Sequence, residues 1–141
     1  MPRFNQDVVS RFITEIRRAV HRLETLKNIP RDDFLRDPDK IDSAKYNFIV
    51  AIESAVDLGS HIVAKNALRA PKDYADTFEV LKEAGAFDES FTPRLKAMAR
   101  FRNRLVHLYW EVENESLRRF LEENLDDFAH FLRDIARFME L

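Results

Sequence analysis

The scarcity of glycine and proline is the feature that most restricts how this chain can fold. Two glycines, Gly59 and Gly85, and five prolines occur in 141 residues. A protein built from many short strands needs turn residues much more often than that. A chain of this length can bury a substantial core. We therefore expect a single all-α domain over residues 1–141, a bundle of about five helices.

Apolar residues recur three and four positions apart along five stretches, which is the spacing of an amphipathic helix. The predicted helices cover about residues 5–28, 41–68, 72–85, 92–107 and 114–138, with a short helical turn near 32–36. Most of the 12 phenylalanines follow this spacing. We therefore interpret them as core residues, not as a surface on which nucleic-acid bases stack.

Certain residues indicate where these helices begin and end. Thr92 is typical of an N-cap because proline follows it, and the Asn114 side chain can cap the last helix. Gly85 is suited to end the third helix. Gly59, inside the second, lowers helix propensity, which is tolerable where a neighbouring helix approaches closely.

The composition excludes several classes of protein. The chain has no cysteine, so it has neither disulfides nor thiolate zinc sites, and this fits a reducing cytosol. The first twenty residues lack a continuous apolar stretch, so we expect no signal peptide and no membrane span there. The expected location is the cytoplasm.

Charge is unevenly distributed around the net value of −2. Residues 91–110 contain no acidic side chain and five basic ones, Arg94, Lys96, Arg100, Arg102 and Arg104. Two interpretations are open. The basic residues pair with acidic neighbours in the fold, or they form a local anion site suited to a phosphate.

Other candidate sites are weaker. Asp57 and His61 are four residues apart on one helix face, where they could share a metal, but without a nearby third ligand a hydrogen bond between them is favoured. Isolated glycines cannot form a phosphate-binding loop. We predict no metal and no cofactor. The remaining polar residues of this kind are interpreted as solvated surface: His21, His130, Glu53, Glu79 and Glu83.

The stretch RNRLVHLYW, residues 102–110, contains the groups that metal-free RNA cleavage requires. His107 titrates near neutrality, so it can deprotonate a 2′-hydroxyl or protonate a leaving oxygen. Arg102 can hold phosphate oxygens with its planar guanidinium. Tyr109 can donate to a phosphate or stack on a base.

Helix geometry restricts how these residues can act together. In a regular helix Arg102 and Tyr109 are about 20° apart, whereas Arg102 and His107 diverge by about 140° and by about 7.5 Å of rise. A straight helix therefore cannot direct both Arg102 and His107 at one phosphorus. Either the helix ends or distorts near Leu108, or two copies of the segment face each other in a dimer.

The sequence RFRNRLVHLYWEV resembles the RX4HXY signature of the HepT-like proteins in the HEPN superfamily, with Arg102, His107 and Tyr109 at the three signature positions. The segments ESAVDLGSHI and PKDYADTFEVLKEAGAF resemble other recurrent parts of that family. The resemblance covers nearly the whole chain. It implies an up-and-down HEPN bundle of four to five helices that forms a homodimer with the two signatures in one cleft.

The resemblance also implies a function. The protein would be the toxin of a type VII-like toxin–antitoxin pair, a metal-independent endoribonuclease acting on tRNA or mRNA. Arg102 and His107 would be catalytic, with Asn103 and Arg104 supporting the site or binding RNA. Its partner would be a minimal nucleotidyltransferase antitoxin that transfers AMP to Tyr109, which adds bulk and negative charge to the cleft.

Two alternatives remain open at this point. The chain could be a non-catalytic subunit that binds nucleotides or holds a nucleotidyltransferase partner. It could also be a structural helical dimer in which RNRLVH is a polar patch at the interface.

Overall fold

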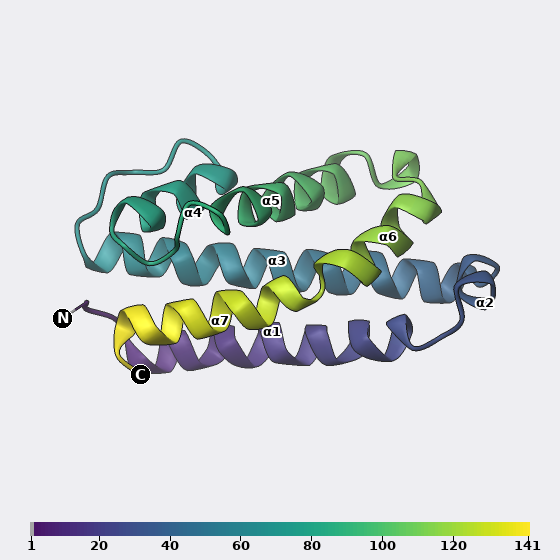
Figure 1. The fold of residues 1–141 in the computed structure, drawn as a ribbon, viewed down its shortest axis with the longest axis horizontal. Coiled ribbons are helices and arrows are strands. Elements are labelled where there is room, and N and C mark those ends of the chain that lie inside the picture. The colour runs from purple at the N-terminus through teal and green to yellow at the C-terminus, as the bar shows by residue number, and fades with distance from the viewer. Residues whose placement is uncertain (1) are drawn as a thin grey trace.

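The computed structural model describes residues 2–141, and within this range it contains helices and no strand. The helices are α1 (Gln6–Lys27), α2 (Arg31–Leu35), α3 (Pro38–Lys65), α4 (Tyr74–Glu83), α5 (Thr92–His107), the 3-10 helix η1 (Tyr109–Glu111), α6 (Asn114–Asn124) and α7 (Asp126–Met139). The long helices run alternately up and down one axis (Figure 1). The predicted all-α, up-and-down bundle is confirmed.

Helix α3 lies at the centre of the bundle. Helix α1 runs antiparallel to it and is joined to it through α2, while α4 and α5 pack on another side (Figure 1). One window of α3 is long and apolar enough to cross a membrane by length and composition, but 56% of that window is buried inside the fold. The apolar character of α3 is that of a central core helix.

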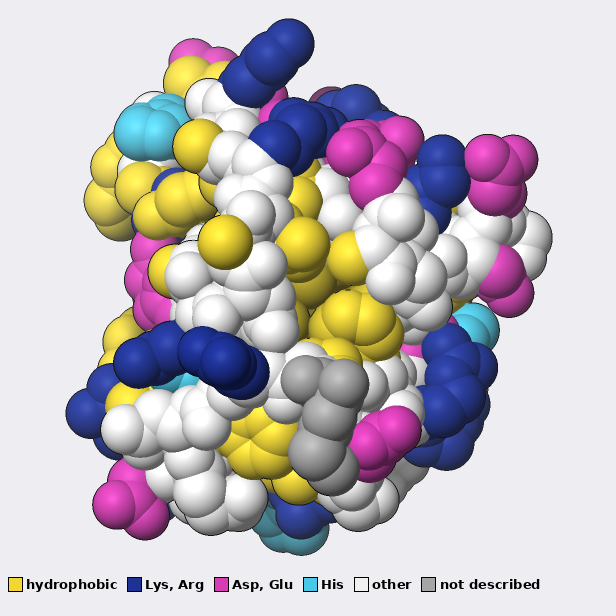
Figure 2. All heavy atoms as spheres, turned by 90° about the vertical axis from the view of Figure 1, so that its left-hand side faces the viewer, with side chains coloured by type: hydrophobic (Ala, Val, Ile, Leu, Met, Phe, Trp, Pro, Cys, Tyr) yellow, Lys and Arg dark blue, Asp and Glu magenta, His cyan; other side chains and the backbone are white. Residues whose placement is uncertain are grey.

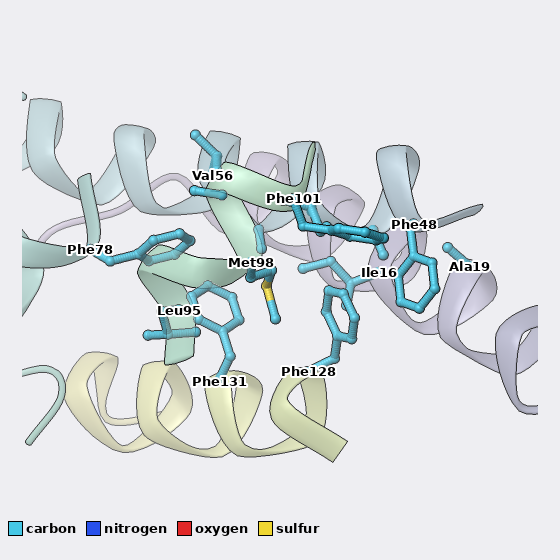
Figure 3. Close-up of a cluster of buried hydrophobic side chains, with 14 of the residues drawn as sticks. Ile16, Ala19, Phe48, Val56, Phe78, Leu95, Met98, Phe101, Phe128 and Phe131 are labelled. Atoms are coloured by element: carbon cyan, nitrogen blue, oxygen red, sulfur yellow. The ribbon is translucent and has the colours of Figure 1, made fainter. Parts of the chain in front are cut away.

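Aromatic side chains from most of the helices form the core. Phe128 and Phe131 of α7 point toward Met98 and Phe101 of α5 (Figure 3). Phe101 is also stacked on Phe120, with ring centres 4.1 Å apart. All 12 phenylalanines are either buried in this core or packed against it. Their interpretation as core residues is confirmed.

The two glycines have different structural roles. A Cβ atom at Gly59 would lie 3.0 Å from Leu81 Cδ1 and 3.1 Å from Thr77 Cγ2, so α4 approaches α3 at this point. Gly85 has φ +97° and follows the end of α4, where its amide donates to the carbonyl of Lys82. Both predictions, close approach at Gly59 and helix termination at Gly85, are confirmed.

Two helix starts differ from the prediction. Thr92 is the first residue of α5, and its hydroxyl donates to the carbonyl of Asp88. The amides of Arg94 and Leu95, which a capping Thr92 side chain would have satisfied, donate instead to the carbonyl of Phe91. Asn114 likewise lies inside α6, which has no side-chain cap.

The last predicted helix is divided in two at Leu125. Arg94 of α5 donates to the carbonyl of Glu123 at 2.9 Å and to the carboxylate of Asp127 at 2.8 Å. In an uninterrupted helix the Glu123 carbonyl would accept from the amide four residues later. The tertiary contact with Arg94 takes that place, which explains why α6 and α7 are separate helices.

Candidate active site

The predicted change in geometry near Leu108 is confirmed. Helix α5 keeps helical hydrogen bonding through its last turn, where the amide of Leu108 donates to the carbonyl of Arg104 at 2.8 Å. Leu108 then has φ −130° and ψ 38°, outside the helical range, and the tighter helix η1 follows. The break therefore comes after His107 and before Tyr109.

Arg102 is largely enclosed, with 13% of its side chain exposed. Its Nη2 forms an ion pair with Glu53 of α3, and its Nη1 donates to Asn103 Oδ1 at 3.1 Å. The guanidinium carbon lies 4.6 Å from the centre of the Tyr74 ring. These contacts hold the guanidinium in one orientation. Asn103 is in contact with Arg102, and its role in orienting the site stays a prediction.

A second carboxylate, Asp57, stands one helical turn from Glu53 on α3. Partial burial raises the pKa of Asp57, and the negative charge of Glu53 raises it further, while Arg102 acts in the opposite direction. Two carboxyl groups therefore share the electrostatic field of Arg102. The interpretation of Glu53 as ordinary helix surface is wrong.

Tyr109 is held by the first turns of α3. Its hydroxyl donates to Asp42 Oδ1 at 2.9 Å. Lys45, which is 5% exposed, donates from Nζ to the Tyr109 backbone carbonyl at 2.9 Å. The same Nζ lies 4.4 Å from the centre of the phenol ring. Burial, followed by the hydrogen bond to Asp42, raises the pKa of Tyr109 to about 12.

His107 has different surroundings from Arg102 and Tyr109. Its side chain is exposed at the end of α5. Because α5 is regular from Arg102 to His107, the divergence of about 140° between them persists. The sequence allowed two arrangements, a helix that ends near Leu108 or a dimer of the segment. The end of the helix changes the position of Tyr109, but it does not bring Arg102 and His107 together in one subunit.

Some basic residues of the segment 91–110 pair with acidic neighbours, and others do not. Arg94 pairs with Asp127, Lys96 with Glu79 and Arg102 with Glu53. Arg100 and Arg104 are exposed, and within residues 2–141 neither forms an ion pair. At the end of the molecule where α1 begins and α7 ends, basic and acidic side chains are interspersed (Figure 2).

The remaining sequence candidates have structural roles. His61 Nε2 accepts from the amide of Asn5 at 2.9 Å, so the predicted hydrogen bond with Asp57 is wrong. Burial and then Lys65 lower the pKa of His61, which suits an accepting imidazole. His130 is stacked on Phe91 with ring centres 3.5 Å apart and is thus not simply solvated. His21 is exposed, as predicted.

Glu79 and Glu83 also have partners that the sequence did not indicate. Glu79 pairs with Lys96 at 2.7 Å and Glu83 with Arg69 at 2.7 Å. In both cases hydrogen bonds from these cations lower the pKa of the carboxyl group. Both glutamates therefore connect α4 to neighbouring segments, and neither lies near His107 or Tyr109 in sequence. Within residues 2–141 no three His, Asp or Glu side chains are grouped as metal ligands.

Sequence reasoning missed three residues of the site, Asp42, Lys45 and Glu53. Asp42 and Glu53 are eleven residues apart, which places them about 20° apart around a helix. The sequence therefore shows them only as polar positions on one face of α3. Lys45 is three residues beyond Asp42. A polar strip on an otherwise apolar central helix was the available signal.

Comparison with known proteins identifies relatives of this architecture. The family model described as Ribonuclease HepT-like matches residues 16–135. A candidate RNase of Archaeoglobus fulgidus is 34% identical over 118 residues, 84% of this chain and 87% of the relative. The protein named mRNA nuclease HepT of Shewanella oneidensis is 25% identical over 126 residues, 89% of this chain and 94% of the relative.

A solved structure agrees in fold. It is described as a tri-AMPylated Shewanella oneidensis HEPN toxin in complex with an MNT antitoxin. It superimposes with a TM-score of 0.86 at 25% identity, covering 94% of this chain and 99% of the toxin. The residues matched by the family model, 16–135, include Arg102, His107 and Tyr109. The chain is a member of the Ribonuclease HepT-like family.

Proposed function

We propose that this protein is a cytoplasmic ribonuclease toxin that cleaves RNA, either tRNA or mRNA, without a metal ion. The observation that carries the proposal is the arrangement at the end of α5. There an enclosed arginine, an exposed histidine and a tyrosine held by α3 occur on the shared fold of the HepT-like family.

The chemistry follows from the properties of two residues. His107 transfers a proton, either from the attacking 2′-hydroxyl or to the leaving 5′-oxygen, while the 2′-oxygen bonds to phosphorus and the bond from phosphorus to the leaving oxygen breaks. Arg102 stabilises the charge that develops on the phosphate oxygens. Asn103 orients Arg102, and Arg104 binds the RNA backbone.

The active form in this proposal is a homodimer. Arg102 and His107 of one subunit diverge along a regular helix, so a second copy supplies the complementary residue. Three apolar side chains beside His107 support such an interface: Val106 is 42% exposed, Leu108 46% and Trp110 90%. Apolar groups of this size rarely cluster on a surface that stays in water.

The proposed partner is a nucleotidyltransferase antitoxin that transfers AMP to Tyr109. The toxin of Shewanella oneidensis is described as tri-AMPylated and in complex with an MNT antitoxin. Tyr109 is half-buried, and its hydroxyl donates to Asp42, which is exposed. AMP at this position places a phosphate and a nucleoside beside His107, which repels RNA and blocks access.

The test is RNA cleavage by the unmodified protein. We expect the His107→Ala variant to lose cleavage of cellular RNA and to relieve growth arrest when expressed without the antitoxin. His21→Ala is the matched control, because His21 is an exposed histidine on α1. Intact tRNA and mRNA in the presence of the wild-type protein would instead indicate the non-catalytic subunit.

A further inference from the structure

The contacts of Tyr109 with α3 are more specific than an acceptor of AMP requires. A tyrosine at a surface needs only an accessible hydroxyl. Here the hydroxyl donates to Asp42 at 2.9 Å, and Lys45 holds both the ring and the backbone carbonyl of the same residue. Both partners come from one face of α3, three residues apart.

The Tyr109 phenol is protonated, so the group that accepts its hydrogen bond is important. With its pKa raised to about 12, Tyr109 is almost entirely protonated at neutral pH. A neutral phenol is a weak nucleophile, so its proton must leave as the oxygen attacks phosphorus. The group that accepts this proton must lie within hydrogen-bond distance of the oxygen. Among the described residues, Asp42 is the acceptor at that distance.

We propose that Asp42 is the general base for AMP transfer to Tyr109, and that Lys45 positions the tyrosine for it. This inference rests on the proposed role of Tyr109 as the AMP acceptor. It assigns part of the catalytic machinery for modification to the modified chain itself, while the antitoxin supplies ATP.

In the transfer step one phosphorus–oxygen bond forms and another breaks. The phenol oxygen bonds to the α-phosphorus of ATP, and the bond from that phosphorus to the oxygen bridging to the β-phosphate breaks. Pyrophosphate leaves with the electron pair. The phenol proton moves to Asp42 Oδ1 and from there to water, since Asp42 is exposed. No oxidant, reductant or further reactant is needed.

Lys45 assists in two ways. Its hydrogen bond to the Tyr109 carbonyl holds η1 against α3 after the end of α5. Its cation, 4.4 Å from the ring centre, interacts more favourably as negative charge develops on the phenol during proton transfer. An interaction that strengthens in the transition state accelerates the step, in addition to orienting the ring.

The experiment measures single-turnover AMP transfer to the full-length protein by its nucleotidyltransferase antitoxin at saturating ATP. Asp42→Asn preserves the size of the side chain and an oxygen that accepts from the phenol, but it cannot take up a proton. We expect its rate to fall by about 100-fold or more, the usual contribution of a general base. Asp39→Asn, one turn earlier and exposed, is the matched control and should react like the wild type.

The pH profile separates a base from a positioning residue. In Asp42→Asn the rate should rise about tenfold per pH unit above neutrality, because only the rare phenolate reacts, whereas the wild-type profile is flatter. A wild-type rate and profile in Asp42→Asn would overturn the inference. If the wild-type protein itself gains no AMP on Tyr109 by mass spectrometry, the proposed function fails instead, and the two failures are thus distinguishable.

Discussion

At the scale of single residues, Tyr109 is the most perturbed group of the site. Burial and the hydrogen bond to Asp42 both favour the neutral phenol, so the pKa is about 12 where an ordinary tyrosine titrates near 10. The neutral form is therefore retained in the folded protein at pH values where the unfolded chain has lost the proton. Stability that depends on Tyr109 is complete below pH 10 and is lost as the pH rises through about 12.

This shift can be measured directly. We predict that phenolate absorbance of the wild type minus that of Tyr109→Phe yields a one-phenol titration curve with its midpoint near 12. Asp42→Asn should move this midpoint down, because the charge of the carboxylate contributes to the shift. A midpoint near 10 in the difference curve would contradict the burial of the phenol.

The residues of the site were predictable to different extents. Arg102, His107 and Tyr109 are close in sequence, and their chemistry is recognisable from type and spacing alone. Asp42 and Glu53 lie 67 and 49 residues away from the groups they contact. Nothing in a single sequence specifies how two helices are aligned, so these partners become visible only when α3 and α5 are placed side by side.

At the scale of helices, the contact between α3 and α4 depends on the missing side chain at Gly59. Thr77 and Leu81 of α4 are buried and occupy the space that a Cβ atom would need. Alanine would improve helix propensity by about 1 kcal/mol, but crowding in a packed interior costs about 1–3 kcal/mol. We expect the crowding to dominate because Thr77 and Leu81 are both buried in the packed interior.

We predict that Gly59→Ala lowers the free energy of unfolding by about 1 kcal/mol, as measured by urea denaturation. Thr77→Ser removes Cγ2, one of the two crowding atoms, and keeps the hydroxyl that donates to Asp73. The double variant should therefore lose less stability than the two single changes added together. Strict additivity would show that Gly59 is not in contact with α4.

The helices show why local patterns predict some boundaries and not others. The spans of α1, α3 and α4 follow from periodicity and from Gly85, which are features of the local sequence. The break at Leu125 depends on Arg94, which is 29 residues from the Glu123 carbonyl that it binds. Periodicity continues across that break, so the sequence alone predicts one helix where the tertiary contact produces two.

At the scale of the whole molecule, one subunit contains every chemical group of the proposed site. Its Arg102 and His107 side chains, however, do not point to the same place. The regular turn geometry of α5 directs Arg102 toward α3 and leaves His107 exposed. A twofold dimer places the same surface of both subunits against each other, so each arginine can face the histidine of the partner subunit.

This arrangement predicts complementation between inactive variants. Arg102→Ala and His107→Ala should each abolish RNA cleavage. Subunits of the two variants, mixed after unfolding and refolded together, should recover about a quarter of the wild-type activity. Half of the dimers are then mixed, and each mixed dimer has one intact site of two. Recovery of no activity would place both residues of a site in the same subunit.

Arg102 contacts Glu53 and Tyr109 contacts Asp42, so both contacts depend on the number of residues between Arg102 and Tyr109. Glu53 and Asp42 are about 16.5 Å apart along α3, whereas seven residues of uninterrupted helix would span only about 10.5 Å. Leaving the helix at Leu108 lengthens the path and lets both residues reach their partners. An inserted residue would rotate everything after it by about 100° and separate Tyr109 from Asp42. Changes in the length of residues 103–106 should thus disrupt the contact between Tyr109 and Asp42 more than single substitutions there do.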